Sequence, residues 1–268
     1  MPRLPTLIRH VKADDGSAIG YHVTGHGPAI LLVHGAASDA RQWSRVVPLL
    51  SRRFTVMAMD RRGRGASGSI GPGHSAEREH ADIAAVATSV DGPVHMVGHS
   101  SGARFVLHAA QLIPNVASMV LYEPPLPETL TPEILESLRA AEAAGDREAV
   151  LATFLLDVAG NDEEALTFIR SRPIWPLMVD NALTLPAELR AVRGYRFRPA
   201  EFAGWSVPVL CLVGGSSEPQ QSTVVDEIVA ALAGAQVVAL PGQGHGAMFS
   251  APELFAAEIE RFVDSLTS

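Results

Sequence analysis

A serine in a short motif bounded by glycines gives the strongest chemical signal in the sequence. Residues 98–102 read Gly-His-Ser-Ser-Gly, after an apolar run at 94–97 and before a segment with helical spacing. A strand, a sharp turn and a helix in this order form a nucleophile elbow, in which the serine stands clear of the sheet. Small neighbours let strand and helix approach closely, and the free N–H groups at the helix start favour a developing anion. The motif predicts that Ser100 is a nucleophile.

A histidine near the C-terminus can supply the base that such a serine needs. His245 lies in the glycine-rich loop 241–247, after the last expected strand and before the last expected helix. Ligands of open α/β sheets bind at the edge where the strands end, and a glycine loop can bring an imidazole there. Imidazole titrates near neutral pH, so it can take the Ser100 proton and later return it. We therefore expect His245 to be the general base.

Small residues after an early apolar run are suited to bind an oxyanion. Residues 31–37 read Leu-Leu-Val-His-Gly-Ala-Ala. An oxyanion hole needs two backbone N–H donors aimed at the developing charge, and small side chains let the backbone come close. The predicted donors are the N–H groups of Ala36 and of Ser101, which follows the nucleophile. His34 is expected to be structural or to line the pocket.

The order of these segments resembles the α/β-hydrolase superfamily. The resemblance is carried by Val-His-Gly at 33–35, Met-Asp-Arg-Arg-Gly-Arg-Gly-Ala-Ser at 59–67, the elbow at Ser100 and Gly-His-Gly at 244–246. It extends over nearly the whole chain, less clearly over its middle. It implies an eight-stranded, mostly parallel sheet flanked by helices, and serine-type acyl chemistry, but no particular substrate. The arginines of the 59–67 segment are interpreted as structural rather than ligand-binding.

Two glutamates compete for the role of the acid that orients His245 and stabilises its imidazolium form. The family usually places this acid after its seventh strand, in a Gly-x-x-Asp-Pro-like turn, and residues 215–219 here read Gly-Ser-Ser-Glu-Pro. Glu218 has the expected place but is one methylene longer than aspartate. Glu123, in Tyr-Glu-Pro-Pro at 122–125, resembles a position that some family members use instead. We favour Glu123, because a strand end beside the elbow holds an acid more rigidly than a serine-rich loop, and Glu218 is the alternative.

Together these residues favour a cofactor-free serine hydrolase that works through an acyl-enzyme. The expected substrate is a small to medium apolar ester, lactone or thioester, and carboxylesterase is the most general description. A second hypothesis keeps the fold but changes the reaction to lyase, carbon–carbon hydrolase or haloperoxidase-like chemistry, since fold does not determine function. A third hypothesis is a non-catalytic small-molecule binding protein, which the presence of a serine, a histidine and two candidate acids disfavours.

Short apolar runs alternate with helical patterns along most of the chain, which predicts a doubly wound α/β fold. Runs that are apolar on both faces suit parallel strands covered by helices. Near the start, 7–11 and 18–24 flank Asp-Asp-Gly at 14–16, a turn signal for an antiparallel hairpin. The expected parallel strands are 30–33, 54–59, 94–97, 116–122, 207–213 and 237–240, and the expected helices are 40–50, 75–89, 101–112, 223–233 and 252–265.

The strand–helix rhythm breaks between 124 and 206, where the chain becomes rich in Ala, Glu and Leu. Helical spacing predicts helices at 132–144, 146–159, 162–171 and 186–192. The segment is far longer than the dozen or so residues that a simple crossover needs, so we interpret it as an inserted helical cap. The expected division is an α/β-hydrolase core at 1–124 and 206–268 and a helical cap at 125–205.

The composition narrows the class of protein. The chain has 268 residues, of which 47% are hydrophobic, enough for a substantial core. Its net charge of −8 disfavours nucleic-acid and anionic-membrane partners, which need a basic face. Because Cys211 is the single cysteine, and neither metal-ligand spacing nor a nucleotide-binding motif occurs, we expect no disulfide, metal or cofactor. Without a secretion signal or a membrane-length apolar run, we expect a cytoplasmic monomer or homodimer that binds a small-molecule substrate.

Overall fold

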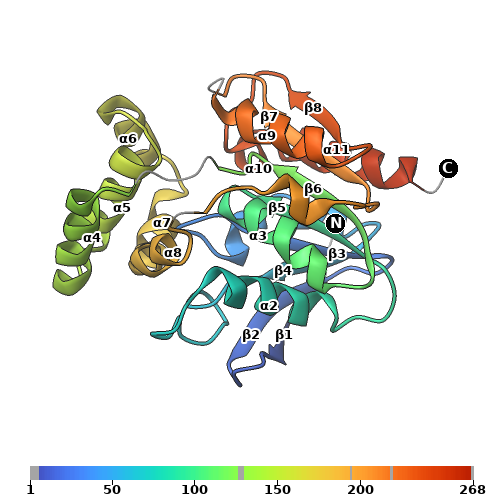
Figure 1. Ribbon diagram of the computed structural model, residues 1–268, viewed down its shortest axis with the longest axis horizontal. Coiled ribbons are helices and arrows are strands. Elements are labelled where there is room, and N and C mark those ends of the chain that lie inside the picture. Colours follow the sequence, from blue (N-terminus) through green and yellow to red (C-terminus); the bar gives the residue numbers. More distant parts are fainter. Residues whose placement is uncertain (1–5, 126–129, 194, 218–219, 267–268) are drawn as a thin grey trace.

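An eight-stranded sheet forms the centre of the molecule in the computed structural model (Figure 1). The structure describes residues 6–125, 130–193, 195–217 and 220–266. The strands are ordered β1-β2-β4-β3-β5-β6-β7-β8, with β3 to β8 parallel and β1 and β2 antiparallel to their neighbours. This order confirms the predicted α/β-hydrolase fold. The strands are β1 (Leu7–Lys12), β2 (Ala18–Thr24), β3 (Ala29–Val33), β4 (Thr55–Met59), β5 (Val94–His99), β6 (Val116–Tyr122), β7 (Val209–Gly214) and β8 (Gln236–Leu240).

The predicted hairpin at the start of the chain is confirmed. β1 and β2 pair in antiparallel register, and the turn between them is closed by the N–H of Ala13, which donates to the carbonyl of Ser17 at 2.8 Å. Gly16 has a φ of +85°, a conformation that glycine adopts without steric cost. The hairpin extends the parallel sheet at the β4 side.

Helices cover both faces of the sheet, which explains why the parallel strands are apolar on both sides. In β3, Leu31 and Val33 join the buried cluster that includes α2, α3 and α9, while Ile30 and Leu32 join the cluster that includes α1 and α11. The helices of these layers, with one short helix after β8, are α1 (Val47–Leu50), α2 (Ala76–Ala87), α3 (Ser101–Ala109), α9 (Gln220–Ala231), α10 (Ala247–Ser250) and α11 (Pro252–Ser265).

One core helix differs from the sequence expectation. The segment expected as a single helix at 40–50 is a 3₁₀ turn at Ala40–Trp43 followed by the short α1. Pro48 occupies the first turn of α1. A proline lacks the N–H that continues a helix and clashes with the preceding turn, so a continuous helix through Pro48 is excluded.

Among the described residues, five α-helices lie between β6 and β7, and we call them the cap helices. Four begin or end near the predicted positions. Three of the four start at a capping residue, Thr131, Asp146 or Asp162, whose side chain accepts a backbone N–H bond. The helix expected at 146–159 ends at Thr153 and continues as a π-helical turn, Phe154–Val158. The cap helices are α4 (Pro132–Ala144), α5 (Arg147–Thr153), α6 (Glu163–Arg170), α7 (Trp175–Asn181) and α8 (Leu185–Ala191).

The helix α7 was not expected from the sequence. Pro176 interrupts its apolar pattern, but that proline sits in the first turn, where a missing N–H costs no helical hydrogen bond. The cap helices share a buried cluster of their own that contains Leu138, Leu151 and Leu185. In Figure 1, α7 and α8 lie between the sheet and the more distant α4, α5 and α6. None of the described helices is both long and apolar enough to cross a membrane.

Candidate active site

Ser100 occupies a strained turn between β5 and α3. Its backbone has φ 53° and ψ −126°, a region that side-chain-bearing residues rarely adopt. The glycines of the motif make the turn possible. A Cβ at Gly98 would lie 2.5 Å from the Cα of Ala103, and one at Gly102 would lie 2.4 Å from the carbonyl oxygen of His34. Both distances are far inside van der Waals contact, so the close approach of α3 to β5 and β3 depends on glycine.

Glu123 follows β6 directly and is completely buried. Its Oε2 accepts from Nδ1 of His245 at 2.6 Å, and its Oε1 accepts from the N–H of Gly214 at 2.7 Å. Its own N–H donates to the carbonyl of Leu212 at 3.1 Å, which ties the residue to β7. Burial alone would raise the pKa of Glu123, but the hydrogen bonds and the charge of His245 outweigh it and hold that pKa below its ordinary value. Glu123 is therefore an ionised acceptor for His245.

Two aromatic rings hold the glycine loop that carries His245. The hydroxyl of Tyr122 donates to the carbonyl of Gly244 and accepts from the N–H of Ala247 at 3.3 Å. Nε2 of His99 lies 2.9 Å from the carbonyl oxygen of His245, and the two imidazole rings are 4.5 Å apart between centroids. The His245 side chain remains 46% exposed, so its imidazole is open to a ligand. Sequence reasoning missed both holding residues, although each adjoins a predicted catalytic residue.

His99 acts in this contact as a neutral donor. Its side chain is buried, and burial together with the charge of His245 holds the pKa of His99 well below its ordinary value. A carbonyl oxygen can only accept, so Nε2 carries the ring proton. Nδ1 of His99 has no hydrogen-bond partner among the described residues.

The carboxyl ends of the parallel strands bring the predicted residues together. The N–H of Ser100 donates to the carbonyl of Tyr122 at 2.9 Å, which joins the elbow to the residue preceding Glu123. Glu123 in turn binds His245, 122 residues away in sequence. Within the described residues, no hydrogen bond of 3.5 Å or less joins the Ser100 hydroxyl to His245. Such bonds often tighten only when substrate is present.

The two predicted oxyanion donors lie on adjacent loops. β3 and β5 pair in parallel with their ends in register, so the loops that follow them start side by side. Gly35 lies against Ser100, since a Cβ at Gly35 would be 3.2 Å from the Cβ of Ser100. Neither the N–H of Ala36 nor that of Ser101 donates to an acceptor in the part of the chain that the structure describes. Both donors are available to a developing negative charge.

Arginines of the 59–67 segment form a buried ion cluster beside these loops. Arg61 donates to Glu79 through Nε at 3.0 Å and through Nη2 at 2.8 Å, and its Nη2 lies 3.1 Å from Oε1 of Glu188 in α8. Arg64 also pairs with Glu188. All four side chains are at most 3% exposed. Burial favours a higher pKa for Glu188, but Arg61 and Arg64 lower it to about 2. The charges of the two arginines and the two glutamates cancel, as expected for arginines with a structural role.

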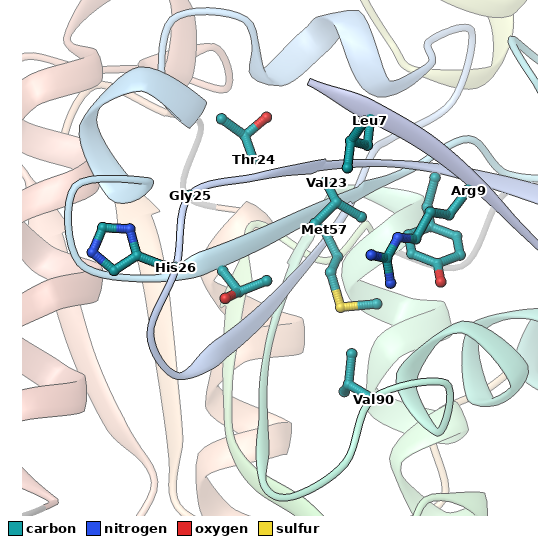
Figure 2. Close-up of a pocket in the computed structure, with 10 residues that line it drawn as sticks. Leu7, Arg9, Val23, Thr24, Gly25, His26, Met57 and Val90 are labelled. Atoms are coloured by element: carbon teal, nitrogen blue, oxygen red, sulfur yellow. The ribbon is translucent and has the colours of Figure 1, made fainter. Parts of the chain in front are cut away.

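One predicted residue lies outside the described part of the chain, and one cavity lies away from Ser100. The competing acid Glu218 lies outside the described residues. A cavity of about 380 Å³ is lined by residues that include Tyr21, Met57 and Val90. Met57 and Val90 are among the lining side chains labelled in Figure 2. Thr55, which begins β4, also lines it, so this cavity extends to the ends of the parallel strands opposite Ser100. No group of three or more potential metal ligands occurs in the described ranges.

Known proteins are similar to this chain in sequence and in fold. Residues 30–258 match the Alpha/beta hydrolase family. The chain is 30% identical to a 2-(acetamidomethylene)succinate hydrolase from Mesorhizobium japonicum, over 90% of each chain. It is 28% identical to a pimeloyl-[acyl-carrier protein] methyl ester esterase from Stenotrophomonas maltophilia, over 91% of this chain and 96% of the relative.

A solved structure is also similar over almost the full length. The crystal structure of an alpha/beta hydrolase from Sphaerobacter thermophilus matches with a TM-score of 0.85 and 32% identity, covering 95% of this chain and 100% of that one. These likenesses support hydrolase activity and leave the substrate open. On both the sequence match and the fold, the chain belongs to the alpha/beta hydrolase family.

Proposed function

We propose that the protein is a cofactor-free serine hydrolase of carboxylic esters, with lactones and thioesters as related substrates. The observation that carries the proposal is the buried Glu123, which accepts from Nδ1 of His245 at 2.6 Å while Ser100 stands on a strained turn nearby. Glu123, His245 and Ser100 supply the acid, base and nucleophile that acyl transfer needs. Backbone strain of this kind is typical of functional sites.

The proposed reaction starts with attack by the Ser100 hydroxyl on the substrate carbonyl. Nε2 of His245 takes the hydroxyl proton, and Glu123 stabilises the resulting imidazolium through Nδ1. The N–H groups of Ala36 and Ser101 bind the oxyanion of the tetrahedral intermediate. His245 then protonates the leaving alcohol, and a water molecule, activated by the same imidazole, hydrolyses the acyl-enzyme.

Contacts around the oxyanion loop support an apolar acyl group. Ala37 belongs to the buried cluster of the cap helices, and Ala36 is partly buried against that cluster. Trp175 and Met178 of α7 pack against the same cluster. An acyl chain bound over the oxyanion hole would meet these apolar side chains, as small-molecule pockets generally require. The methyl ester esterase among the relatives supports an ester as the substrate.

The first test is covalent labelling by a fluorophosphonate probe, read by intact-mass spectrometry. The probe needs an activated serine and an oxyanion hole but little specificity. We expect one adduct per chain on the wild type and none on Ser100→Ala. Hydrolysis of a p-nitrophenyl ester series, with a lactone and a thioester beside it, then ranks the substrates.

Two outcomes would contradict the proposal. The absence of an adduct on well-folded protein would favour lyase, haloperoxidase-like or binding functions on the same fold. A rise in melting temperature with an uncleaved ligand would then indicate a binding protein. An adduct that persists in Ser100→Ala would place the reactive group elsewhere.

A further inference from the structure

One carbonyl oxygen next to the predicted oxyanion hole accepts from two buried donors. The oxygen of Gly35 lies 2.8 Å from Nδ1 of His34 and 3.3 Å from Nη1 of Arg61. Nε2 of His34 accepts from the backbone N–H of Arg61 at 3.0 Å, so the His34 proton is on Nδ1 and is donated to this carbonyl. The pKa of His34 is lowered to about 3 by burial and by the arginines, which keeps the ring neutral.

This carbonyl belongs to the same peptide unit as the N–H of Ala36. No cis peptide bond occurs in the described residues. In a trans unit the C=O and N–H groups point in opposite directions. The Gly35 oxygen is held towards the buried cluster, so the N–H of Ala36 is directed away from that cluster. Gly35 itself lies against Ser100 on the nucleophile side.

The guanidinium of Arg61 also reaches the second loop. Its Nη1 lies 3.2 Å from the hydroxyl oxygen of Ser101, whose N–H is the other predicted donor. Arg61 is completely buried, carries a permanent charge, and has its guanidinium carbon 4.6 Å from the ring centre of Phe105. Glu79 and Glu188 hold it by the bonds described above. One rigid cation therefore contacts both segments that carry the oxyanion donors.

We propose that Arg61 is a positioning residue for the oxyanion hole, which orients and polarises the Gly35–Ala36 peptide and braces Ser101. This inference rests on the proposed function. A cation that binds a carbonyl oxygen draws electrons from the peptide, so the N–H on its other end becomes a stronger donor. The stronger N–H donor stabilises the substrate most when the substrate oxygen that it binds carries full negative charge, as in the tetrahedral intermediate. Loss of Arg61 should therefore lower kcat and leave the KM of a neutral ester nearly unchanged.

The neighbouring Arg62 provides a matched control. It is also buried, at 2% exposed, and it binds Asp82 through two hydrogen bonds of 2.8 and 2.7 Å. Its remaining side-chain contacts are with Asp15 and Ser17. Arg62 thus has the same charge, the same loop and a similar ion pair, but no hydrogen bond to either oxyanion segment. A purely structural role for Arg61 predicts equal effects at both positions.

The experiment compares Arg61→Lys with Arg62→Lys. It follows the demonstration that the wild type reacts with the fluorophosphonate probe and hydrolyses an ester. Lysine keeps a cation beside the buried glutamates, so both variants are expected to fold. Values of kcat are divided by the number of serines titrated to completion with fluorophosphonate, which removes unfolded protein from the comparison. We expect kcat to fall about tenfold or more for Arg61→Lys, a part of the 10²- to 10³-fold loss typical of removing an oxyanion donor. KM should stay within about threefold, and binding of a trifluoromethyl ketone should weaken in parallel with kcat/KM.

Several results would overturn the inference. Equal losses for the two lysine variants, or a loss confined to KM, would make Arg61 merely structural. If Arg61→Lys does not fold, the same assay on Glu188→Gln decides, because that change removes one anchor of Arg61. An unchanged kcat for Glu188→Gln would then overturn the inference, and a fall of about threefold or more would support it. A wild type that neither labels nor turns over would instead refute the proposed function, so the two failures are distinguishable.

Discussion

The loops at the carboxyl edge of the sheet and the cap helices are held in different ways. Among the described residues, the non-glycine positions with positive φ are Ala37, Ser100 and Glu123, which lie in the loops after β3, β5 and β6. Strain of this kind costs about 1–3 kcal/mol per residue and persists only where the surroundings over-determine the backbone. The cap helices instead rely on ordinary N-caps and a cluster of buried leucines.

The two regions meet through apolar packing of Ala37 in the cap cluster and through a few polar contacts. Asn181 donates to Asp39 at 3.0 Å, and Glu188 pairs with Arg61 and Arg64. If the proposed function holds, we infer from this difference that the rigid edge of the sheet carries the reaction and that the cap helices influence which substrates reach it. Changes at the sheet edge should therefore affect the rate of reaction, and changes in the cap should affect substrate preference and stability.

The largest expected effect is that of Ser100→Ala. Removal of the nucleophile should lower kcat by at least about 10⁴-fold, because binding and the oxyanion hole alone leave only residual catalysis. The melting temperature should change little, since the turn stays in place. Ester hydrolysis and thermal unfolding of the two proteins, run side by side, test this. A variant with a tenth of wild-type activity would show that Ser100 is not the nucleophile.

The next effect distinguishes the two candidate acids. Glu123→Gln should lower kcat by about 10³- to 10⁴-fold, because a neutral amide cannot stabilise the imidazolium of His245. Glu218→Gln serves as the matched control and should keep nearly full activity. The measurement is kcat/KM for one ester with all three proteins. A larger loss at Glu218 would favour the alternative acid, and small, equal losses would refute both assignments.

A cap substitution should affect stability and preference rather than chemistry. Leu151→Ala, in the cap cluster, should cost about 2–5 kcal/mol of unfolding free energy. It should also change the ratio of kcat/KM between long and short acyl esters by about threefold or more. Leu210→Ala in β7 is the control, because it makes the same leucine-to-alanine change at another buried position. It should destabilise the fold without changing that ratio. Equal shifts of preference in both variants would break the distinction between the two regions.

The smallest expected effect is a pH dependence of stability. The folded-state pKa of Glu123 is below its ordinary value, so the ionised carboxylate stabilises the fold above the unfolded-state pKa, about 4.3. That contribution is lost as the pH falls through the folded-state pKa. The difference in unfolding free energy between wild type and Glu123→Gln should therefore be largest near neutral pH and narrow below about pH 4. Urea denaturation at several pH values measures it, and a constant difference would contradict the ionised state.

Much of the fold follows from local patterns. The elements β6 (Val116–Tyr122), α4 (Pro132–Ala144) and α11 (Pro252–Ser265) have the bounds that periodicity and capping residues predict. Two of the failures, α1 and α7, occur where proline disturbs the pattern. Proline's effect depends on whether it falls in the first turn of a helix, and the apolar pattern does not reveal where that turn begins.

By itself, the sequence determined the elbow around Ser100, the alternation of strands and helices, and the existence of a helical insertion, because each depends on neighbours along the chain. The partner of His245 was decided only by the tertiary structure. Glu123 reaches it across 122 residues, because two loops end at the same edge of the sheet. The sequence also did not predict the contacts of Arg61 with Gly35, Ser101 and Glu188. Buried charges must find partners wherever the fold provides them, and those partners lie close in space rather than along the chain.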